Sequence, residues 1–200
     1  EQLPLQQQQQ QQQSFGAIES VMLPPTRQWL RARAIIAAFE EQNTDCLVIT
    51  GGLHPTFSPE EVLQAPGIDA VCLGEGELAF RELLLACEAQ SGELRQLDRY
   101  PALKNIWLRG RSRPPMHPPA EIDNLPWMER DLLNERYGVI YMTTQRGCPF
   151  PCTYCAARMY NQLYGSQQYG RRRSLEDVFA EIEHIRANGP LNYIVFLDDT

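Results

Sequence analysis

The chain has few of the features that would place it at a membrane or on nucleic acid. It has no apolar run long enough to span a bilayer, and its start lacks the basic and apolar segments of a secretory signal. Positive charge is also scarce. Eighteen lysines and arginines stand against 25 aspartates and glutamates, so the net charge is −7 and the isoelectric point is about 5.0. These absences argue against a membrane span and against sequence-independent binding to nucleic acid, and they favour a reduced, cytoplasmic setting.

Residues 1–17 are rich in glutamine, and residues 6–13 form an unbroken glutamine tract. Such a tract buries no apolar surface, so we expect a disordered tail there and assign it no function. The whole chain, with 43% hydrophobic and 22% charged residues, nevertheless has the composition of a globular protein.

Beyond residue 17, short apolar runs alternate with amphipathic segments. Strands are expected at 18–23, 46–50 and 70–73, and helices at 27–42, from 59 onward and at 77–89. Ser58, Pro59 and Glu61 have the pattern of a capping box with proline in the first turn, so Ser58 is the expected N-cap. This order favours an α/β fold with a parallel, doubly wound sheet. Residues 18–108 are therefore expected to form an incomplete Rossmann-like domain, with an edge strand at 105–108.

A second region follows a segment that is unsuited to regular structure. Residues 109–119 contain four prolines and three arginines, and we interpret 109–135 as a proline-rich linker. Strands are then expected at 139–144 and 193–197, with a helix between them that begins at a Ser174-x-x-Asp177 box. One parallel strand pair and one helix leave strand faces uncovered, so residues 136–200 are expected to be the N-terminal part of a larger, truncated domain.

Three cysteines with C-x3-C-x2-C spacing, Cys148, Cys152 and Cys155, lie on the loop after the strand at 139–144. Ligands bind at the carboxyl ends of strands in parallel α/β folds. Structural zinc and electron-transfer iron–sulfur cubanes usually take four protein ligands, so three thiolates favour a four-iron cluster with one open iron. Zinc stays an alternative if a distant Cys or His supplies the fourth ligand. The other cysteines lie in apolar runs, where we expect small hydrophobic side chains rather than disulfides: Cys46, Cys72 and Cys87.

The cysteine loop resembles the C-x3-C-x-aromatic-C signature of radical S-adenosylmethionine (SAM) enzymes, with Tyr154 as the aromatic residue. The resemblance implies that Cys148, Cys152 and Cys155 hold a 4Fe–4S cluster whose open iron binds the amino and carboxylate groups of SAM. An electron from the cluster would then cleave SAM to methionine and a 5′-deoxyadenosyl radical. Tyr154 would lie beside the cluster or SAM, although simple packing explains an aromatic side chain there equally well.

Charged residues flank this loop in sequence. Asp198 and Asp199 end the last expected strand, and the resemblance implies that they contact the SAM amino group, although the usual Gly-Gly-Glu form is absent. A carboxylate suits an ammonium partner, and a solvated strand end is the alternative. Residues 171–173 are three arginines directly before a helix N-cap, and we expect them to be solvated rather than to bind an anionic substrate.

The first region resembles the cobalamin-binding domain that precedes one subfamily of radical SAM enzymes. The matching segments are TGGLHPTFSPEE at 50–61 and DAVCLGEGE at 69–77. The resemblance implies that glycine loops cradle the nucleotide tail of cobalamin, through Gly51, Gly52, Gly74 and Gly76. Glycine suits this role because it lets backbone N–H groups approach a bulky polar ligand.

Two departures from that domain accompany the resemblance. No D-x-H-x-x-G motif is present, so that source of an axial histidine ligand is absent, and the first βα unit is missing before residue 18. His54 is therefore expected to serve in a turn or cap rather than as a cobalt ligand.

Together, the resemblances imply a partial Rossmann-like cobalamin-binding domain followed by the start of a radical SAM (β/α) partial barrel. The implied reaction is cobalamin-assisted methyl transfer or oxidative cyclisation of a small-molecule substrate, with flavodoxin or ferredoxin as electron donor. Two alternatives stay open, namely a radical SAM enzyme that does not use cobalamin and a non-catalytic zinc module. Because most of a barrel is missing, we expect these 200 residues alone to have little activity.

Overall fold

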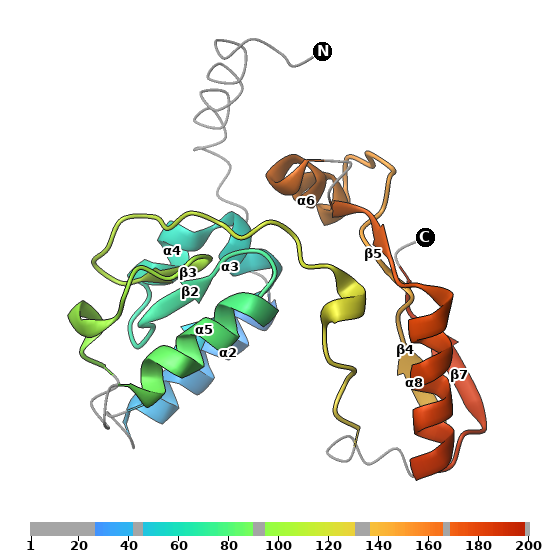
Figure 1. Cartoon of the computed structure of the whole chain (residues 1–200). Helices are drawn as coiled ribbons and strands as arrows, with labels where there is room; N and C mark the ends of the chain where they lie inside the picture. The colour runs from blue at the N-terminus through green and yellow to red at the C-terminus, as the bar shows by residue number, and fades with distance from the viewer. Residues whose placement is uncertain (1–26, 42–45, 90–94, 131–136, 166–168, 199–200) are drawn as a thin grey trace.

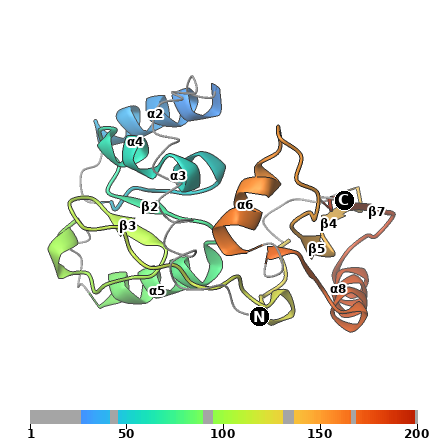
Figure 2. The ribbon, with the colours of Figure 1, turned by 90° about the horizontal axis from the view of Figure 1, so that it is seen from above.

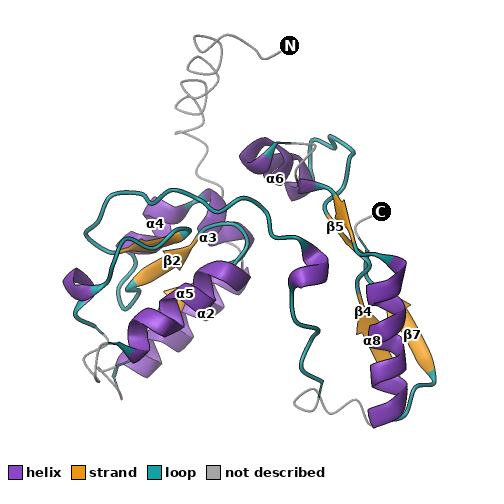
Figure 3. Ribbon diagram, viewed as in Figure 1, coloured by secondary structure: helices purple, strands orange, loops and turns teal. Residues whose placement is uncertain are grey.

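A computed structural model describes residues 27–41, 46–89, 95–130, 137–165 and 169–198 (Figure 1). The expected tail at 1–17, the expected strand at 18–23 and Asp199 lie outside the described residues. The element order is mixed α and β, as the sequence predicts (Figure 3). Within the described ranges, none of the helices combines the length and the apolar character needed to cross a membrane.

The first unit is built on a three-stranded sheet in the order β1-β2-β3. β1 (Ile49–Thr50) and β2 (Ala70–Cys72) are parallel, as predicted. The expected edge strand is also present, as β3 (Ile106–Leu108), but it runs antiparallel to β2 and so departs from an all-parallel sheet. All three residues of β2 are buried, because this strand has a neighbour on each side and helices over both faces.

Alternate residues of β2 enter two separate apolar clusters, as strand geometry requires. Ala70 and Cys72 pack with Ala79 and Leu83 of α5 (Glu77–Glu88). Val71 faces the other way, in a cluster formed with α2 (Arg27–Glu40) and α4 (Pro59–Gln64). Figure 2 shows α2 and α4 on one side of the strands and α5 on the other. The first unit is therefore a three-layer α/β sandwich.

The helix expected from residue 59 is present, but its predicted capping box is wrong. The side chain of Ser58 makes no capping hydrogen bond, and its backbone N–H donates to the His54 carbonyl at 2.9 Å. The cause is a helical turn that the sequence did not predict, α3 (Leu53–Phe57), which ends directly before Ser58. His54 lies inside this helical turn, where its carbonyl accepts from the C-cap Ser58 N–H and its ring is 5.1 Å from that of Trp29.

The proline-rich segment is irregular over most of its described length, with one 3-10 turn at Ile122–Asn124. Its arginines nevertheless anchor it to the first unit. The Arg109 guanidinium donates to the carbonyls of Ile68 at 2.7 Å and Ala65 at 2.6 Å. Arg111 donates in the same way to the carbonyls of Tyr100 and Leu97, both at 2.7 Å. These bonds satisfy backbone acceptors that no strand or helix would satisfy.

The second unit contains a parallel pair of strands, β4 (Val139–Met142) and β7 (Tyr193–Phe196), in the predicted order. Between them lie α6 (Ala156–Tyr164) and α8 (Leu175–Asn188). The sequence missed a short antiparallel ribbon of β5 (Gln145–Arg146) and β6 (Arg171–Arg172), which precedes and follows the cysteine loop and α6.

The N-cap of α8 is confirmed, because the Ser174 hydroxyl accepts from the Asp177 N–H at 3.1 Å. In a complete capping box the Asp177 carboxylate would accept from the Ser174 N–H, but here another residue makes that bond. The Ser174 N–H donates to the Asp123 carboxylate at 3.0 Å, so the linker closes the cap in place of Asp177.

Candidate functional site

The cysteine loop begins at the end of the ribbon strand β5 and ends where α6 begins. Cys148 and Cys152 are half-buried, Cys155 is exposed, and all three are free thiols. The Cys155 N–H donates to the Cys152 carbonyl at 3.2 Å, and the Asn161 side-chain amide of α6 donates to the Cys148 carbonyl at 2.8 Å. The loop is thus folded back on its own helix, with its thiols on one short segment.

The three sulfur atoms are not gathered into a finished metal site. Across the described parts of the chain, no group of three Cys, His, Asp or Glu side chains is close enough to hold a metal ion. The chemistry of the donor set nevertheless fits an iron–sulfur cluster, since three free thiols share one loop. Tyr154 is 90% exposed, so it is not fixed by packing and is free to lie beside a bound group.

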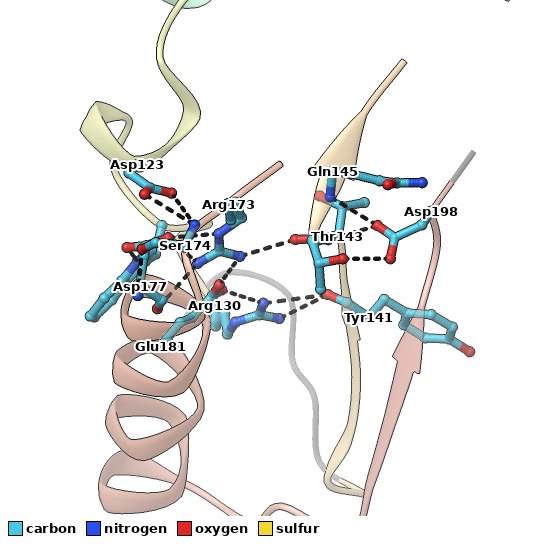
Figure 4. A network of polar contacts seen from close by, with 12 residues as sticks. Asp123, Arg130, Tyr141, Thr143, Gln145, Arg173, Ser174, Asp177, Glu181 and Asp198 are labelled. Carbon is cyan, nitrogen blue, oxygen red and sulfur yellow. Dashed lines mark hydrogen bonds and ion pairs between the residues drawn. The ribbon is translucent and has the colours of Figure 1, made fainter. Parts of the chain in front are cut away.

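Asp198 joins the carboxyl ends of the two parallel strands (Figure 4). Its carboxylate accepts from the Thr144 N–H at 2.6 Å, the Thr144 hydroxyl at 2.8 Å and the Gln145 N–H at 3.1 Å. Asp198 therefore lies at the predicted edge of the strands, next to the entry to the cysteine loop. In this position it holds the β4–β5 connection rather than presenting a free carboxylate.

The loop after β1 leaves room and polar groups for a ligand. Gly52 has a φ of +101°, and a Cβ added there would meet no atom within 4 Å among the described residues. The Thr50 hydroxyl and the Nε2 atom of His54 are buried, yet neither has a hydrogen-bond partner within the described structure. Buried polar atoms without partners are costly, so this edge, with Gly51 beside it, suits a polar ligand such as the tail of cobalamin.

The loop after β2 is already occupied by the protein itself. The Gly74 N–H donates to the Thr56 hydroxyl at 3.0 Å, and the Glu75 N–H donates to the phenol oxygen of Tyr164, in α6, at 2.8 Å. A Cβ on Gly74 would lie 1.9 Å from the same Tyr164 oxygen, and one on Gly76 would lie 3.5 Å from the Cys72 sulfur. Of the backbone groups in this loop, the Gly74 N–H is thus bonded within the first unit, and the Glu75 N–H holds the second unit.

Aromatic rings line this junction between the two units. The rings of Tyr160, Tyr164 and Tyr169 stack with centroids 4.9 to 6.3 Å apart, and Phe57 of α3 meets Tyr160 edge-on at 5.1 Å. Burial raises the pKa of Tyr164 from its ordinary value of 10.0 to about 12.

Charged contacts join the same two units. The guanidinium of Arg171 forms an ion pair with the Glu75 carboxylate, and Arg146 pairs with Glu77 at 2.6 Å and with Glu75 at 3.5 Å. Burial alone would raise the pKa of Glu77, but the hydrogen bond and charge of Arg146 outweigh it and hold that pKa below its ordinary value. The prediction that the arginines at 171–173 are solvated is wrong for Arg171, whose side chain is only 11% exposed.

The prediction is also wrong for Arg173, which belongs to a second buried network (Figure 4). Arg173 and Arg130 both bind the Glu181 carboxylate, at 2.6 and 2.8 Å. The two arginines also donate to backbone carbonyls of Thr143 and Tyr141, on and just after β4. The network therefore ties the linker, α8 and β4 together.

Sequence reasoning missed Glu75 and Arg146 as members of the site. Glu75 stands between the two glycines of the LGEGE stretch, and Arg146 precedes Cys148 by two residues. The available signal was one charged residue of each sign, Glu75 inside the DAVCLGEGE segment and Arg146 just before the cysteine motif, but nothing in the sequence pairs them.

Comparison with known proteins finds relatives in sequence and in fold. Residues 20–84 match the B12 binding domain family. Over 168 residues the chain is 35% identical to an uncharacterized methyltransferase of Pyrococcus horikoshii, covering 79% of this chain and 34% of that protein. Over 182 residues it is 29% identical to the anaerobic magnesium-protoporphyrin IX monomethyl ester cyclase of Rubrivivax gelatinosus, covering 84% and 31%.

A solved structure has a similar fold. The cobalamin-dependent S-adenosylmethionine radical enzyme OxsB, determined with aqua-cobalamin and S-adenosylmethionine bound, aligns with a TM-score of 0.57 at 22% identity, over 83% of this chain and 23% of its own. The chain thus spans about a third of the length of the curated relatives. Residues 20–84 therefore belong to the B12 binding domain family, and the chain is similar in sequence to a methyltransferase and to a cyclase, and in fold to a cobalamin-dependent radical enzyme.

Proposed function

We propose that this protein is part of a radical SAM enzyme whose residues 148–155 hold a 4Fe–4S cluster and whose first unit binds cobalamin. The observation that carries the proposal is the loop of three free cysteines, which follows β4 and β5 and leads into α6, the helix whose Tyr164 is bonded to the glycine loop after β2. Three thiol ligands leave one iron open for a cosubstrate. When bound, such a cluster supplies the electron for the reductive cleavage of SAM.

The residues of the chain would prepare this site in defined ways. Asn161 fixes the Cys148 carbonyl and so limits the movement of the cysteine loop. Asp198 holds the end of β4 against β7, which sets where the loop starts. Tyr154, with most of its surface exposed, is available to lie against SAM. We keep Asp198 and Asp199 as candidates for the SAM ammonium group, with Asp198 using lone pairs not engaged by its present donors.

For cobalamin, the structure favours the β1 loop over the β2 loop. Gly52 has open space among the described residues, and Thr50 and His54 beside it have unpartnered polar atoms, whereas the backbone N–H groups at Gly74 and Glu75 are already bonded within the protein. Gly74 and Gly76 would take part only if Tyr164 left its position. The proposed contact with the cofactor is therefore made first at residues 50–54.

The proposed reaction is methyl transfer or oxidative cyclisation on a small-molecule substrate, because curated relatives include a methyltransferase and a cyclase. The enzyme would work in a reduced cytoplasm with flavodoxin or ferredoxin as donor. A radical SAM enzyme that does not use cobalamin is the second candidate, and the occupied β2 loop is the observation that favours it.

The test is anaerobic reconstitution of the chain with iron and sulfide, followed by metal analysis and EPR of the reduced protein with and without SAM. We expect about four irons per chain, and an EPR signal that changes when SAM is added. Cys152→Ala should lose the cluster, whereas Cys87→Ala, which alters a half-buried cysteine in the first unit, should keep it. Stoichiometric zinc in place of iron would refute the proposal.

Cobalamin binding is measured separately from the visible spectrum of protein mixed with hydroxocobalamin and freed of excess. Bound cobalamin in the wild-type chain, and its loss in Gly52→Val, would support the first candidate. A reconstituted cluster without retained cobalamin would select the second.

A further inference from the structure

The Glu75 carboxylate lies where the B12-binding domain meets the second unit. It pairs with Arg171 through both of its oxygens, and it accepts from the Ala120 N–H at 3.1 Å. The side chains of Glu75 and Arg171 are only 14% and 11% exposed. A bidentate, largely buried pair of this kind has a defined geometry, unlike an ion pair at the surface.

The partners of Glu75 belong to the ribbon that carries the cysteine loop. Arg146 in β5 lies opposite Arg171 in β6, so the carboxylate contacts both strands at the same register position. Cys148 follows β5 after a single residue, Gly147, where a Cβ would lie 2.8 Å from the Tyr169 ring. The entry to the loop therefore has little freedom to shift while Glu75 holds the ribbon.

The exit of the cysteine loop is attached to the same residue. α6 begins directly after Cys155, and its last residue, Tyr164, accepts a hydrogen bond from the Glu75 N–H at 2.8 Å. Tyr164 is 8% exposed and stacks on Tyr160 and Tyr169. Glu75 thus binds the segment before the first cysteine through its carboxylate and the helix after the last one through its backbone.

We propose that Glu75 is a positioning residue that fixes the cysteine loop against the glycine edge of the B12-binding domain. This inference rests on the proposed function, because it gives the loop a cofactor to position. Removing one partner of the buried Glu75–Arg171 ion pair would leave the other charge buried and unpaired. The ribbon is therefore held only while both partners are present. The loop would then be ordered before any metal binds, and the two cofactor-binding edges would be held facing each other.

The test uses Glu75→Gln in the whole 200-residue chain, first without metal. Alkylation by iodoacetamide is followed at each cysteine by mass spectrometry, with exposed Cys155 and first-unit Cys87 as references. We expect Cys148 and Cys152 to react about tenfold faster in the variant, because local opening exposes them, while Cys87 is unchanged. If Cys148 and Cys152 are alkylated at the same rate in the variant as in the wild type, the proposal is overturned.

A matched control separates positioning from general stability. Glu181→Gln also removes the charge of a buried carboxylate held by two arginines, but these partners, Arg130 and Arg173, belong to the linker and the second unit. It should lower the urea midpoint without exposing Cys148. Faster alkylation of Cys148 in both variants would show that the rates follow stability alone, and would refute a positioning role.

A double variant, Glu75→Gln with Arg171→Met, removes both buried charges. The urea midpoint should recover towards the wild-type value, since no charge is left unpaired. Alkylation of Cys148 should stay fast, because the ion pairs between the Glu75 carboxylate and the ribbon are still missing. Recovery of the wild-type urea midpoint together with the slow, wild-type alkylation of Cys148 would contradict the proposal.

Reconstitution then separates this inference from the proposed function. If wild-type protein takes up iron, Glu75→Gln should lose it to a chelator about tenfold faster, and an unchanged rate would refute positioning. If wild-type protein takes up no iron, the proposed cluster is refuted, while the alkylation experiment still decides whether Glu75 orders the loop.

Discussion

Replacement of Gly74 by alanine is the sharpest perturbation of the junction between the units. Gly74 has a φ of +69°, and an added Cβ would lie 1.9 Å from the Tyr164 oxygen, 2.9 Å from its Cζ and 2.8 Å from the Met116 methyl carbon. The conformation alone costs alanine about 1–2 kcal/mol. Tyr164 must also leave, which breaks its bond to the Glu75 N–H, and this loss costs about 1 kcal/mol.

Moving Tyr164 also exposes a ring that is now 8% exposed, which costs about 1.5 kcal/mol or more. The total loss in the free energy of unfolding is therefore about 4 kcal/mol. Gly110→Ala is the matched control. Its φ is +79°, but an added Cβ would meet no atom within 4 Å among the described residues, so only the backbone cost of about 1–2 kcal/mol should remain.

Both variants are compared with the wild type by urea unfolding, followed by far-UV circular dichroism and linear extrapolation. We expect Gly74→Ala to be less stable than Gly110→Ala by about 2–3 kcal/mol. A difference below about 0.5 kcal/mol would mean that Tyr164 does not occupy the loop in solution, and the argument for a fixed junction would fail.

Two further predictions concern one helix cap and one buried thiol. Ser174→Ala should lower the free energy of unfolding by about 1 kcal/mol, because it removes the hydroxyl that accepts from Asp177, whereas Ser58→Ala, at a cap without such a bond, should cost less than half as much. If urea unfolding shows that both variants lose the same free energy of unfolding, the cap hydrogen bonds described above are contradicted. Burial, reinforced by the charge of Glu77, raises the pKa of Cys72 from 9.0 to about 11, so between these pH values the folded state binds more protons and rising pH destabilises it. The loss of stability from pH 9 to 11 should be shallower in Cys72→Ala, and an unchanged slope would show that this thiol ionises normally.

The elements that the sequence predicted well are those set by local pattern. β2, α2, α5 and α8 follow from apolar runs, helical periodicity and a serine cap, and the structure contains all four. The edge strand was also predicted, but not its antiparallel direction, because strand direction depends on the path of the chain between strands.

The misses come from interactions between residues far apart in the sequence. Arg171 was expected to be solvated because it stands just before a helix N-cap, and its partner, Glu75, lies 96 residues away. The two-residue strands β5 and β6 are too short to give a pattern of their own. α3 begins after Gly52, and its His54 packs on Trp29. A capping motif in the sequence does not indicate such a contact.

For the candidate site, the sequence predicted which residues belong to it better than how their side chains are arranged. The spacing of the three cysteines identifies the loop, but it does not determine where the sulfur atoms lie, because metal binding itself draws the ligands of such a site together. Asp198 was correctly located at the strand edge, while its bonds to Thr144 and Gln145 depend on how β4 and β7 pair.

The uncovered side of the second unit has a consequence for the behaviour of the chain in solution. Large apolar side chains on and near α8 and β7 are 50–71% exposed: Leu175, Phe179, Tyr193, Phe196 and Leu197. At pH 7 the net charge of −7 keeps neighbouring molecules apart, but this repulsion disappears near the isoelectric point of about 5.0. Acidification would then let these surfaces meet, so the chain should precipitate in mildly acidic buffer while its first unit is still folded.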